Sequence, residues 1–167
     1  MSARIVQISV SRGGVPKTAV PAARVTTDGV EGDAHRNGNL HGGPERAVCL
    51  FSMEAILALQ AEGHAIAPGA IGENVTVEAL DWSAVTPGAH LMLGHSVLLQ
   101  ITRYTSPCRN IAHVFSDGQI ARVSQKQHPG WSRVYARVLV EGVIRPNDPV
   151  RLVDEIEAAE IKVTALP

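Results

Sequence analysis

The part of the chain best suited to chemistry surrounds the second of its two cysteines, Cys108. It reads Tyr-Thr-Ser-Pro-Cys-Arg-Asn-Ile over residues 104–111 and follows an apolar run, 97–102, that predicts a strand. Ser106 is a good helix N-cap, and Pro107 is a good first helical residue because it lacks the N–H that would be unpaired there. We therefore expect a short helix that begins at Ser106 and carries Cys108 in its first turn.

The expected position of Cys108 favours its thiolate form. Unpaired N–H groups and the helix dipole stabilise negative charge in a first turn, and Arg109 adds a neighbouring cation. A thiolate binds metals and attacks electrophiles, whereas a free neutral cysteine is usually a small buried hydrophobic residue. Spacing alone leaves both interpretations of Cys108 open.

The other cysteine, Cys49, lies in a different sequence context. It sits inside the apolar run Ala-Val-Cys-Leu-Phe at residues 47–51, with no positive charge close to it in the sequence. We expect this thiol to be packed and unreactive. Stable disulfides are rare in the cytoplasm, and two cysteines are too few for a disulfide scaffold, so we expect both thiols to be reduced.

A glycine-rich polar segment over residues 31–46 is a second candidate site. It contains Asp33, His35 and His41, whose side chains are all of types that bind zinc. No further cysteine or histidine follows at finger-like spacing, so an ordered surface loop is the simpler interpretation.

Two more glycine-containing segments have groups that bind ligands in other proteins. Residues 68–74 place an acid and an amide at a strand entrance, where they bind a heterocycle or simply form a turn. Residues 11–17 resemble a small anion-binding loop with Arg12 and Lys17 as counter-charges. This loop lacks the strand, glycine-lysine and helix pattern of a nucleotide-binding P-loop.

The elements that must position these segments are mostly strands. Short runs rich in Val, Ile and Leu are interrupted by Gly, Pro, Asn or Asp, which is typical of a mostly β domain. The predicted strands are 5–10, 46–51, 74–77, 90–93, 97–102, 134–140 and 150–153. Besides the short helix at Ser106, we predict one helix over 52–61, capped by Ser52 and stopped by Gly63, and another over roughly 118–127.

The composition limits the partners of the protein. Its 167 residues include 15 basic and 16 acidic side chains, a formal charge of −1, which predicts neither nucleic-acid binding nor a polybasic membrane anchor. The sequence has no apolar run of about 18 residues that would span a membrane, and no signal peptide at its start. We expect one cytoplasmic domain over residues 1–167, with no nucleic acid and no membrane among its partners.

Taken in order along the chain, these segments resemble the MOSC family, and within it the YiiM-like branch. The matching residues are Gly-Asp at 32–33, His-Gly-Gly-Pro-Glu-Arg-Ala-Val at 41–48, Ile-Gly-Glu-Asn at 71–74, Pro-Gly at 87–88 and Ser-Pro-Cys at 106–108. With residues 11–17 ahead and 130–140 behind, the resemblance covers nearly the whole chain. It implies a closed or partly closed β-barrel of the MOSC type, like the pyruvate-kinase barrel, with a few short helices.

The resemblance also implies a cofactor and a reaction. MOSC relatives bind the molybdenum cofactor, a pterin dithiolene with a terminal phosphate, through a cysteine that corresponds to Cys108. A soft thiolate is chemically suited to this metal. Active relatives reduce N-hydroxylated small molecules, such as hydroxylaminopurines, with electrons from a separate electron-transfer protein. The implied function is a molybdenum-dependent oxidoreductase, and a homodimer is one assembly that we consider.

Several other residues receive roles from the same resemblance. Arginine and lysine side chains would neutralise the cofactor phosphate, and amide and hydroxyl groups would bond the pterin or the phosphate oxygens. The residues expected to bind the cofactor are Arg12, Lys17, Arg46, Asn74, Thr105, Ser106 and Arg109. His41 would shape the pocket or donate a proton near the metal, which makes it a catalytic candidate beside Cys108.

Two alternative functions share these motifs. The first is a carrier that holds the cofactor, or sulfur as a persulfide on Cys108, without turnover. The second is a zinc-binding or purely structural barrel that uses Asp33, His35 and His41. In cofactor sulfurases the related domain follows a pyridoxal phosphate domain, and we expect no such domain within this chain.

Overall fold

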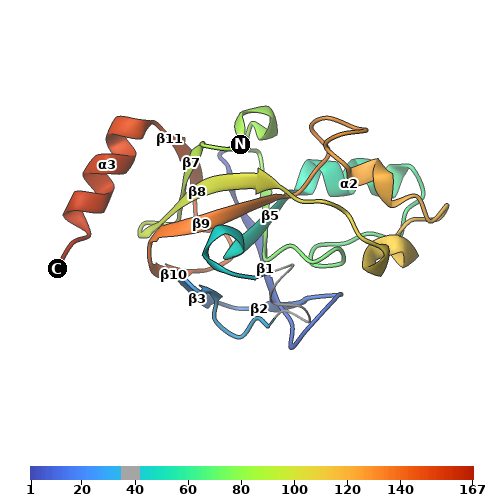
Figure 1. The fold of residues 1–167 in the computed structure, drawn as a ribbon, viewed down its shortest axis with the longest axis horizontal. Coiled ribbons are helices and arrows are strands. Elements are labelled where there is room, and N and C mark those ends of the chain that lie inside the picture. Colours follow the sequence, from blue (N-terminus) through green and yellow to red (C-terminus); the bar gives the residue numbers. More distant parts are fainter. Residues whose placement is uncertain (35–41) are drawn as a thin grey trace.

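The computed structural model describes residues 1–34 and 42–167 and consists mainly of strands (Figure 1). The strands are β1 (Arg4–Val10), β2 (Thr18–Val20), β3 (Ala23–Thr26), β4 (Gly29–Val30), β5 (Val48–Ser52), β6 (Val75–Glu78), β7 (His90–Leu93), β8 (Val97–Tyr104), β9 (Val134–Val140), β10 (Gly142–Ile144) and β11 (Val150–Val153). The α-helices are α2 (Met53–Ala61) and α3 (Glu155–Thr164). Short 3-10 helices are η1 (Pro44–Arg46), η2 (Trp82–Ala84), η3 (Arg109–Val114) and η4 (Ile120–Val123).

The strands form two sheets, and within the described residues neither is closed into a barrel. The larger sheet has the order β11-β7-β8-β9-β5-β6-β1-β2, and the smaller has the order β10-β3-β4. An isolated bridge pairs Arg4 with Pro149, which brings the start of β1 to the start of β11. From Ile8 onward the same edge of β1 pairs with β2. No continuous ladder of hydrogen bonds therefore joins β11, at one end of the larger sheet, to β1 near the other end. The mostly β class is confirmed, and the predicted barrel is not.

Most predicted strands are present with small shifts at their ends. The predictions at 90–93, 134–140 and 150–153 match β7, β9 and β11. The predicted strand at 46–51 begins later, at Val48, because Pro44 opens the 3-10 turn η1 and cannot donate to a strand ladder. The short strands β2, β3, β4 and β10 were not predicted, because their runs are brief or partly exposed.

The helices differ more from the sequence-based predictions. Helix α2 begins after Ser52, whose hydroxyl accepts a hydrogen bond from the N–H of Ala55 at 3.2 Å, as expected of an N-cap. The predicted helix over 118–127 is wrong, since only the 3-10 turn η4 forms there. Helix α3 was missed, although Asp154 caps it through the N–H of Glu157.

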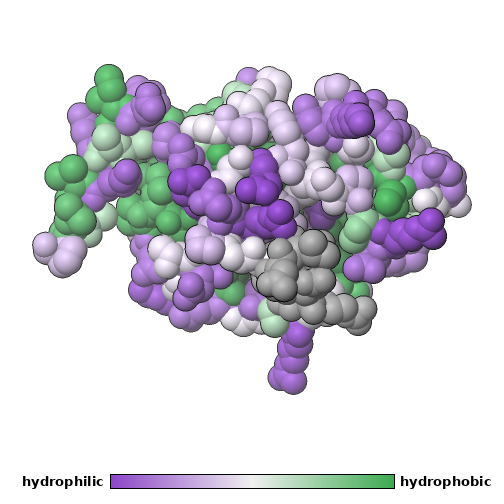
Figure 2. Space-filling model, in the orientation of Figure 1, coloured by the Kyte–Doolittle hydropathy of each residue, from purple (hydrophilic) through white to green (hydrophobic). Residues whose placement is uncertain are grey.

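Two regions cover opposite ends of the larger sheet. Helix α2 and the turns η3 and η4 gather at one end, where Phe51, Ile71 and Ile111 belong to one buried cluster, and α3 lies at the other end (Figure 1). Apolar side chains show on the surface over α3, whereas the centre of the visible face is largely polar (Figure 2). No described helix has the length and apolar character needed to cross a membrane.

Candidate functional site

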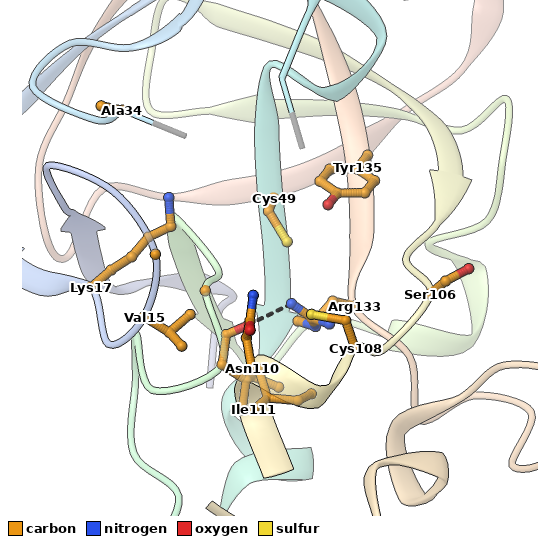
Figure 3. Close-up of a pocket in the computed structure, with 13 residues that line it drawn as sticks. Val15, Lys17, Ala34, Cys49, Ser106, Cys108, Asn110, Ile111, Arg133 and Tyr135 are labelled. Atoms are coloured by element: carbon orange, nitrogen blue, oxygen red, sulfur yellow. Dashed lines mark hydrogen bonds between the residues drawn. The ribbon is translucent and has the colours of Figure 1, made fainter. Parts of the chain in front are cut away.

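Segments that are far apart in the sequence meet in a pocket beside η3 (Figure 3). The space within it that water can occupy is about 80 Å³, and the pocket is partly open to solvent. Its walls come from the loop at 14–17, from β5, from residues 71–72, from 106–111 and from 133–135. The anion-like loop, the Gly-Glu-Asn segment and the Ser-Pro-Cys segment singled out in the sequence therefore lie around one space.

Cys108 is half-buried and lines this pocket, with its sulfur directed into the open space (Figure 3). The predicted local geometry is wrong, however. Cys108 has an extended backbone, with φ −127° and ψ 167°, and precedes η3 as its N-cap residue. The pairing of β8 with the segment before β9 continues to Thr105, whose N–H bonds to the carbonyl of Arg133 at 3.0 Å, and η3 begins only at Arg109. Cys108 therefore does not lie in a first helical turn, the position that was predicted to favour its thiolate.

Cys49 is buried in β5, as predicted, but it lines the same pocket as Cys108. Burial raises the pKa of the Cys49 thiol to about 11, although the nearby Arg133 opposes the shift. Cations that are distant from Cys49 in the sequence, Arg133 and Lys17, therefore lie near it in the fold. Burial also raises the pKa of Tyr135, on the same wall, to about 12.

Arg133 is the most important site residue that the sequence reasoning missed. Its side chain is buried and lines the pocket, and its Nη1 atom donates a hydrogen bond to the carbonyl of Ile71 at 2.5 Å. Its Nε atom is buried and has no hydrogen-bond partner within the described residues. The only signal for Arg133 in the sequence is a charged residue at the entrance of the apolar strand that follows Gly130.

The predicted cofactor-binding cations are placed unevenly around the pocket. Lys17 lines it, and its ammonium group pairs with Asp33 at 2.5 Å. Arg46 is half-buried and lies over the ring of Tyr135, with 5.7 Å between the guanidinium carbon and the ring centroid. Arg12 and Arg109 are exposed and are not among the residues that line the pocket. Arg133, and not Arg109, is therefore the arginine that lines the pocket together with Cys108.

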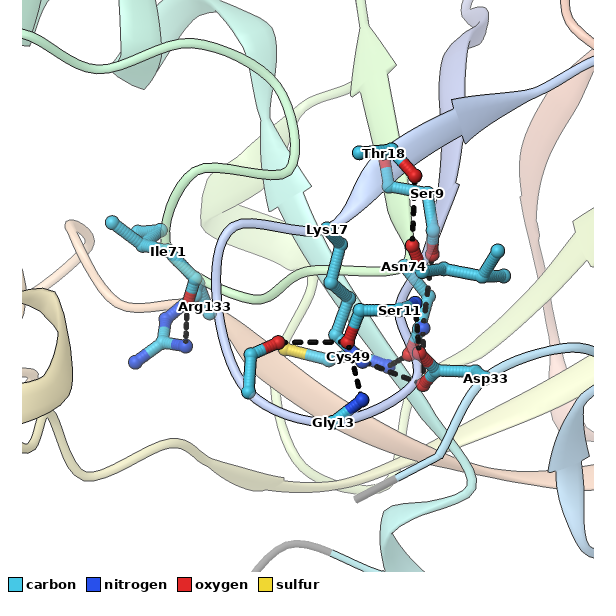
Figure 4. Close-up of polar contacts among 12 residues, drawn as sticks. Ser9, Ser11, Gly13, Lys17, Thr18, Asp33, Cys49, Ile71, Asn74 and Arg133 are labelled. Atoms are coloured by element: carbon cyan, nitrogen blue, oxygen red, sulfur yellow. Dashed lines mark hydrogen bonds and ion pairs between the residues drawn. The ribbon is translucent and has the colours of Figure 1, made fainter. Parts of the chain in front are cut away.

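Asn74 and Asp33 form a buried polar network next to the pocket (Figure 4). The amide nitrogen of Asn74 donates to Asp33 at 2.9 Å and to the carbonyl of Ser9 at 3.2 Å. Its amide oxygen accepts the N–H of Cys49 at 3.0 Å, and Asp33 also accepts from Lys17. Asn74 is not among the pocket-lining residues, and these contacts occupy the groups with which it was predicted to bind a cofactor.

The zinc alternative loses support from the same network. The carboxylate of Asp33 is already bonded to Lys17 and Asn74, and also to the N–H of Ser11 at 2.9 Å. The described part of the chain holds no group of three His, Cys, Asp or Glu side chains able to bind a metal ion. His35 and His41, including the catalytic role predicted for His41, lie outside the described residues.

Glu73 is a fully buried acid close to this polar network. One carboxylate oxygen accepts from the N–H of Gly69 at 2.6 Å and from the hydroxyl of Thr76 at 3.2 Å, while the other has no partner among the described residues. Burial raises the pKa of Glu73, which favours its neutral form. Glu73 is therefore poorly suited to neutralise Arg133.

The two hydroxyl residues predicted to bind the cofactor, Thr105 and Ser106, differ in which pocket they line. Ser106 is exposed and lines both the main pocket, which contains Cys108, and a more open depression next to it. Thr105 is buried and lines only the depression, and its hydroxyl has no partner within the described part of the chain. Of the two, Ser106 is therefore the one that can reach a ligand in the main pocket.

A family model described as the MOSC domain matches residues 37–151, more than half of the chain, so the chain belongs to the MOSC domain family. Protein YiiM of Escherichia coli (strain K12) is 29% identical over 146 residues, which cover 84% of this chain and 63% of YiiM. YflK of Bacillus subtilis (strain 168) is 29% identical over 149 residues, covering 89% of this chain and 66% of YflK. The chain thus spans about two thirds of the length of these curated relatives, and its resemblance to the YiiM-like branch is confirmed.

Solved structures show the same similarity in three dimensions. The crystal structure of YiiM from Geobacillus stearothermophilus has a TM-score of 0.70 at 27% identity, covering 91% of this chain and 75% of that one. The crystal structure of YiiM from Escherichia coli has a TM-score of 0.69 at 25% identity, covering 93% of this chain and 71% of that one. The sheet-rich fold described above is therefore that of its relatives.

Proposed function

We propose that this protein binds a molybdenum cofactor in the pocket beside η3, with Cys108 as the metal ligand, and reduces N-hydroxylated small molecules. The observation that carries the proposal is the meeting of a half-buried thiol, Cys108, with the buried cations Lys17 and Arg133 in one pocket of a MOSC domain. Neither the thiol alone nor the cations alone would distinguish this pocket from an ordinary surface cleft.

The pocket suits the chemistry of a phosphorylated pterin dithiolene. A thiolate is a soft ligand for the metal, and a guanidinium offers the planar fork that binds phosphate oxygens. Arg133 has an unpartnered, buried Nε atom and no ion-pair partner within the described residues, so it can accept an anionic group without losing an existing ion pair. Lys17 is already paired with Asp33 and adds less.

Each wall of the pocket has a distinct task under this proposal. When bound, the cofactor supplies the redox chemistry needed to cleave an N–O bond, with electrons from a separate electron-transfer protein. Cys108 holds the metal, and Arg133 holds the anionic part of the cofactor. Tyr135 keeps its proton because its pKa is raised to about 12, so it can donate a hydrogen bond to the ligand. Val15 and Ile71 give the pocket apolar surface that limits water.

The first test is the metal content of protein produced in a host that makes the cofactor. We expect about one molybdenum per chain, lost on Cys108→Ser and kept on Cys49→Ser. Both cysteines line the pocket, so the second variant controls for a general disturbance of the site. Molybdenum that survives Cys108→Ser would overturn the proposed ligand.

The second test concerns the cation. We expect Arg133→Gln to lower molybdenum content at least tenfold, because a charge-assisted hydrogen bond to phosphate is among the stronger polar interactions. Arg137→Gln is the matched control, since Arg137 lies on β9, the strand that follows Arg133, but pairs with Glu45 at 2.6 Å and does not line the pocket. Equal metal loss in both variants would count against a phosphate role for Arg133.

Reduction of a hydroxylaminopurine with an artificial electron donor separates the reductase from the carrier alternative. We expect turnover by the metal-loaded protein and none by Cys108→Ser. Metal-loaded protein that does not turn over would favour a carrier of cofactor or of sulfur.

A further inference from the structure

Helix α3 exposes an apolar stripe that its own chain does not cover. Ile156, Val163 and Leu166 are 72%, 69% and 71% exposed, although aliphatic side chains of this size are usually buried. Within α3, Ile156, the exposed Ala159 and Val163 are spaced by three and four residues, and Leu166 follows three residues later, just past the end of the helix. This is the spacing of a seam along which one helix packs against another.

The opposite face of α3 already holds the helix to the protein. Ala158 is buried and belongs to a cluster with Met92, Leu98 and Val153, against which Ile161 also packs. The exposed stripe is therefore not needed to dock α3 on the sheet. It faces away from the body at the end opposite α2, where apolar side chains are visible on the surface (Figure 2).

The charges beside the stripe indicate which partner fits it. Glu155 and Lys162 are seven residues apart, so they flank the stripe on the same side, and neither forms an ion pair with the described residues. If two copies of α3 pack antiparallel, Glu155 of each copy lies beside Lys162 of the other. Parallel packing would instead bring Glu155 of one copy beside Glu160, the exposed acid on the other side of the stripe, in its partner, so that like charges would meet.

We propose that α3 is a self-association surface, through which two copies of this chain form a two-fold symmetric dimer with antiparallel helices. A two-fold interface must be complementary to itself, and the stripe with Glu155 and Lys162 meets this condition. Glu160, at the middle of the helix on the other side of the stripe, lies near its own copy and weakens the pair. A pair of helices of ten residues each is short compared with the roughly 1,600 Å² of a standard stable interface. The dimer is therefore weak and depends on protein concentration.

The test is sedimentation equilibrium of the 167-residue protein over a range from about 1 µM to about 1 mM, which spans weak affinities. We expect a reversible monomer–dimer equilibrium. Ile156→Lys together with Val163→Lys should remove the dimer across this range. Leu57→Lys is the matched control, since Leu57 is an apolar residue on α2 that is 52% exposed, and it should leave the equilibrium unchanged.

Charge exchange tests the antiparallel arrangement itself. We expect Glu155→Lys and Lys162→Glu each to weaken self-association at least fivefold, because each variant places like charges together. A mixture of the two single variants should form a heterodimer, and the chain with both substitutions should dimerise again. A monomer at all concentrations, a dimer that survives Ile156→Lys and Val163→Lys, or a failure of the mixture to associate would overturn the proposal.

Discussion

The pocket has two walls that differ in how far the fold has already used their polar groups. The strand wall consists of Cys49, Arg133 and Tyr135, from β5 and the start of β9, and is largely buried. Its groups are held in place, for example by the hydrogen bond from Arg133 to Ile71. The loop wall consists of residues 106–111. Its polar side chains are half-buried or exposed, and no side-chain hydrogen bond to another described residue is found for Cys108 or Asn110.

This difference separates residues that build the pocket from residues that are available to a ligand. A side chain already bonded within the protein must lose that bond before it can bind anything else, at a cost of about 1–3 kcal/mol for a buried group. Cys108 and Asn110, on the loop wall, have no side-chain hydrogen bond to another described residue that a ligand would have to replace. Cys49 is buried and its pKa is raised to about 11, so the half-buried Cys108 is the better ligand of the two pocket thiols. Arg133 belongs to both groups of residues because only part of its guanidinium is bonded within the protein.

The largest expected difference between the walls is in thiol reactivity. At pH 8 we expect iodoacetamide to alkylate Cys49 about a thousandfold more slowly than Cys108. A pKa of about 11 lowers the thiolate fraction of Cys49 about a hundredfold below that of an ordinary thiol, and burial limits access further. Mass spectrometry of peptides from timed reactions measures both rates. Cys108→Ser should leave only the slow site, and comparable rates in the native protein would break the comparison.

The next largest effect concerns stability behind the strand wall. Asn74→Ala should lower the free energy of unfolding by about 3 kcal/mol, because it leaves buried partners such as the N–H of Cys49 without their hydrogen bonds. Asn110→Ala, on the loop wall, should change it by less than about 0.5 kcal/mol. Urea unfolding of both variants at pH 7 compares them. Equal losses would show that the loop wall is as firmly built as the strand wall.

A somewhat smaller effect appears at high pH. Because the folded protein raises the pKa of Cys49 from about 9 to about 11, the native state keeps a proton that the unfolded chain loses. Stability linked to this thiol is therefore intact below pH 9 and is lost as pH rises toward 11, by roughly 2–3 kcal/mol. Urea unfolding across this range should show a shallower decline for Cys49→Ala. Parallel curves would mean that Cys49 ionises normally.

The smallest effect is expected at Glu73. Burial raises its pKa, so the folded protein disfavours the charged form that the unfolded chain adopts above pH 4.5. Glu73→Gln removes this penalty while keeping the acceptor for the N–H of Gly69. The variant should gain stability relative to the native chain as pH rises from 4.5 to 7. A difference that does not change with pH would show that Glu73 is ionised without cost.

Local signals account for what the sequence predicted correctly. The apolar runs at 90–93 and 134–140 predicted strands, and Ser52 predicted the start of α2, because each depends on neighbouring residues alone. Helix α3 was missed because its most apolar residues, such as Ile156 and Val163, face away from the core. Closure of the sheet depends on how Arg4 meets Pro149, a contact that no local pattern encodes.

The site divides in the same way. The sequence brought out Cys108 and Lys17, both of which line the pocket. It could not identify Arg133, because an arginine at a strand entrance usually faces solvent and its burial here depends on Ile71, 62 residues away. The sequence analysis assigned Asn74 a role in cofactor binding. The sequence does not show whether an asparagine amide is free to bind a ligand or is already bonded within the protein, as Asn74 is.

The positions of the pocket residues along the chain also determine how late in folding the pocket can form. Its residues extend from Gly14 to Tyr135, and β5, which carries Cys49, pairs with β9 through residues about ninety positions further along the chain. Contacts at such separation form late, because the intervening chain must first be ordered. During synthesis the thiol of Cys108 is made before Arg133 and before the strand that completes the opposite wall. A ligand that contacts both walls can therefore bind only after the chain has been made through Tyr135 and β9 has paired with β5.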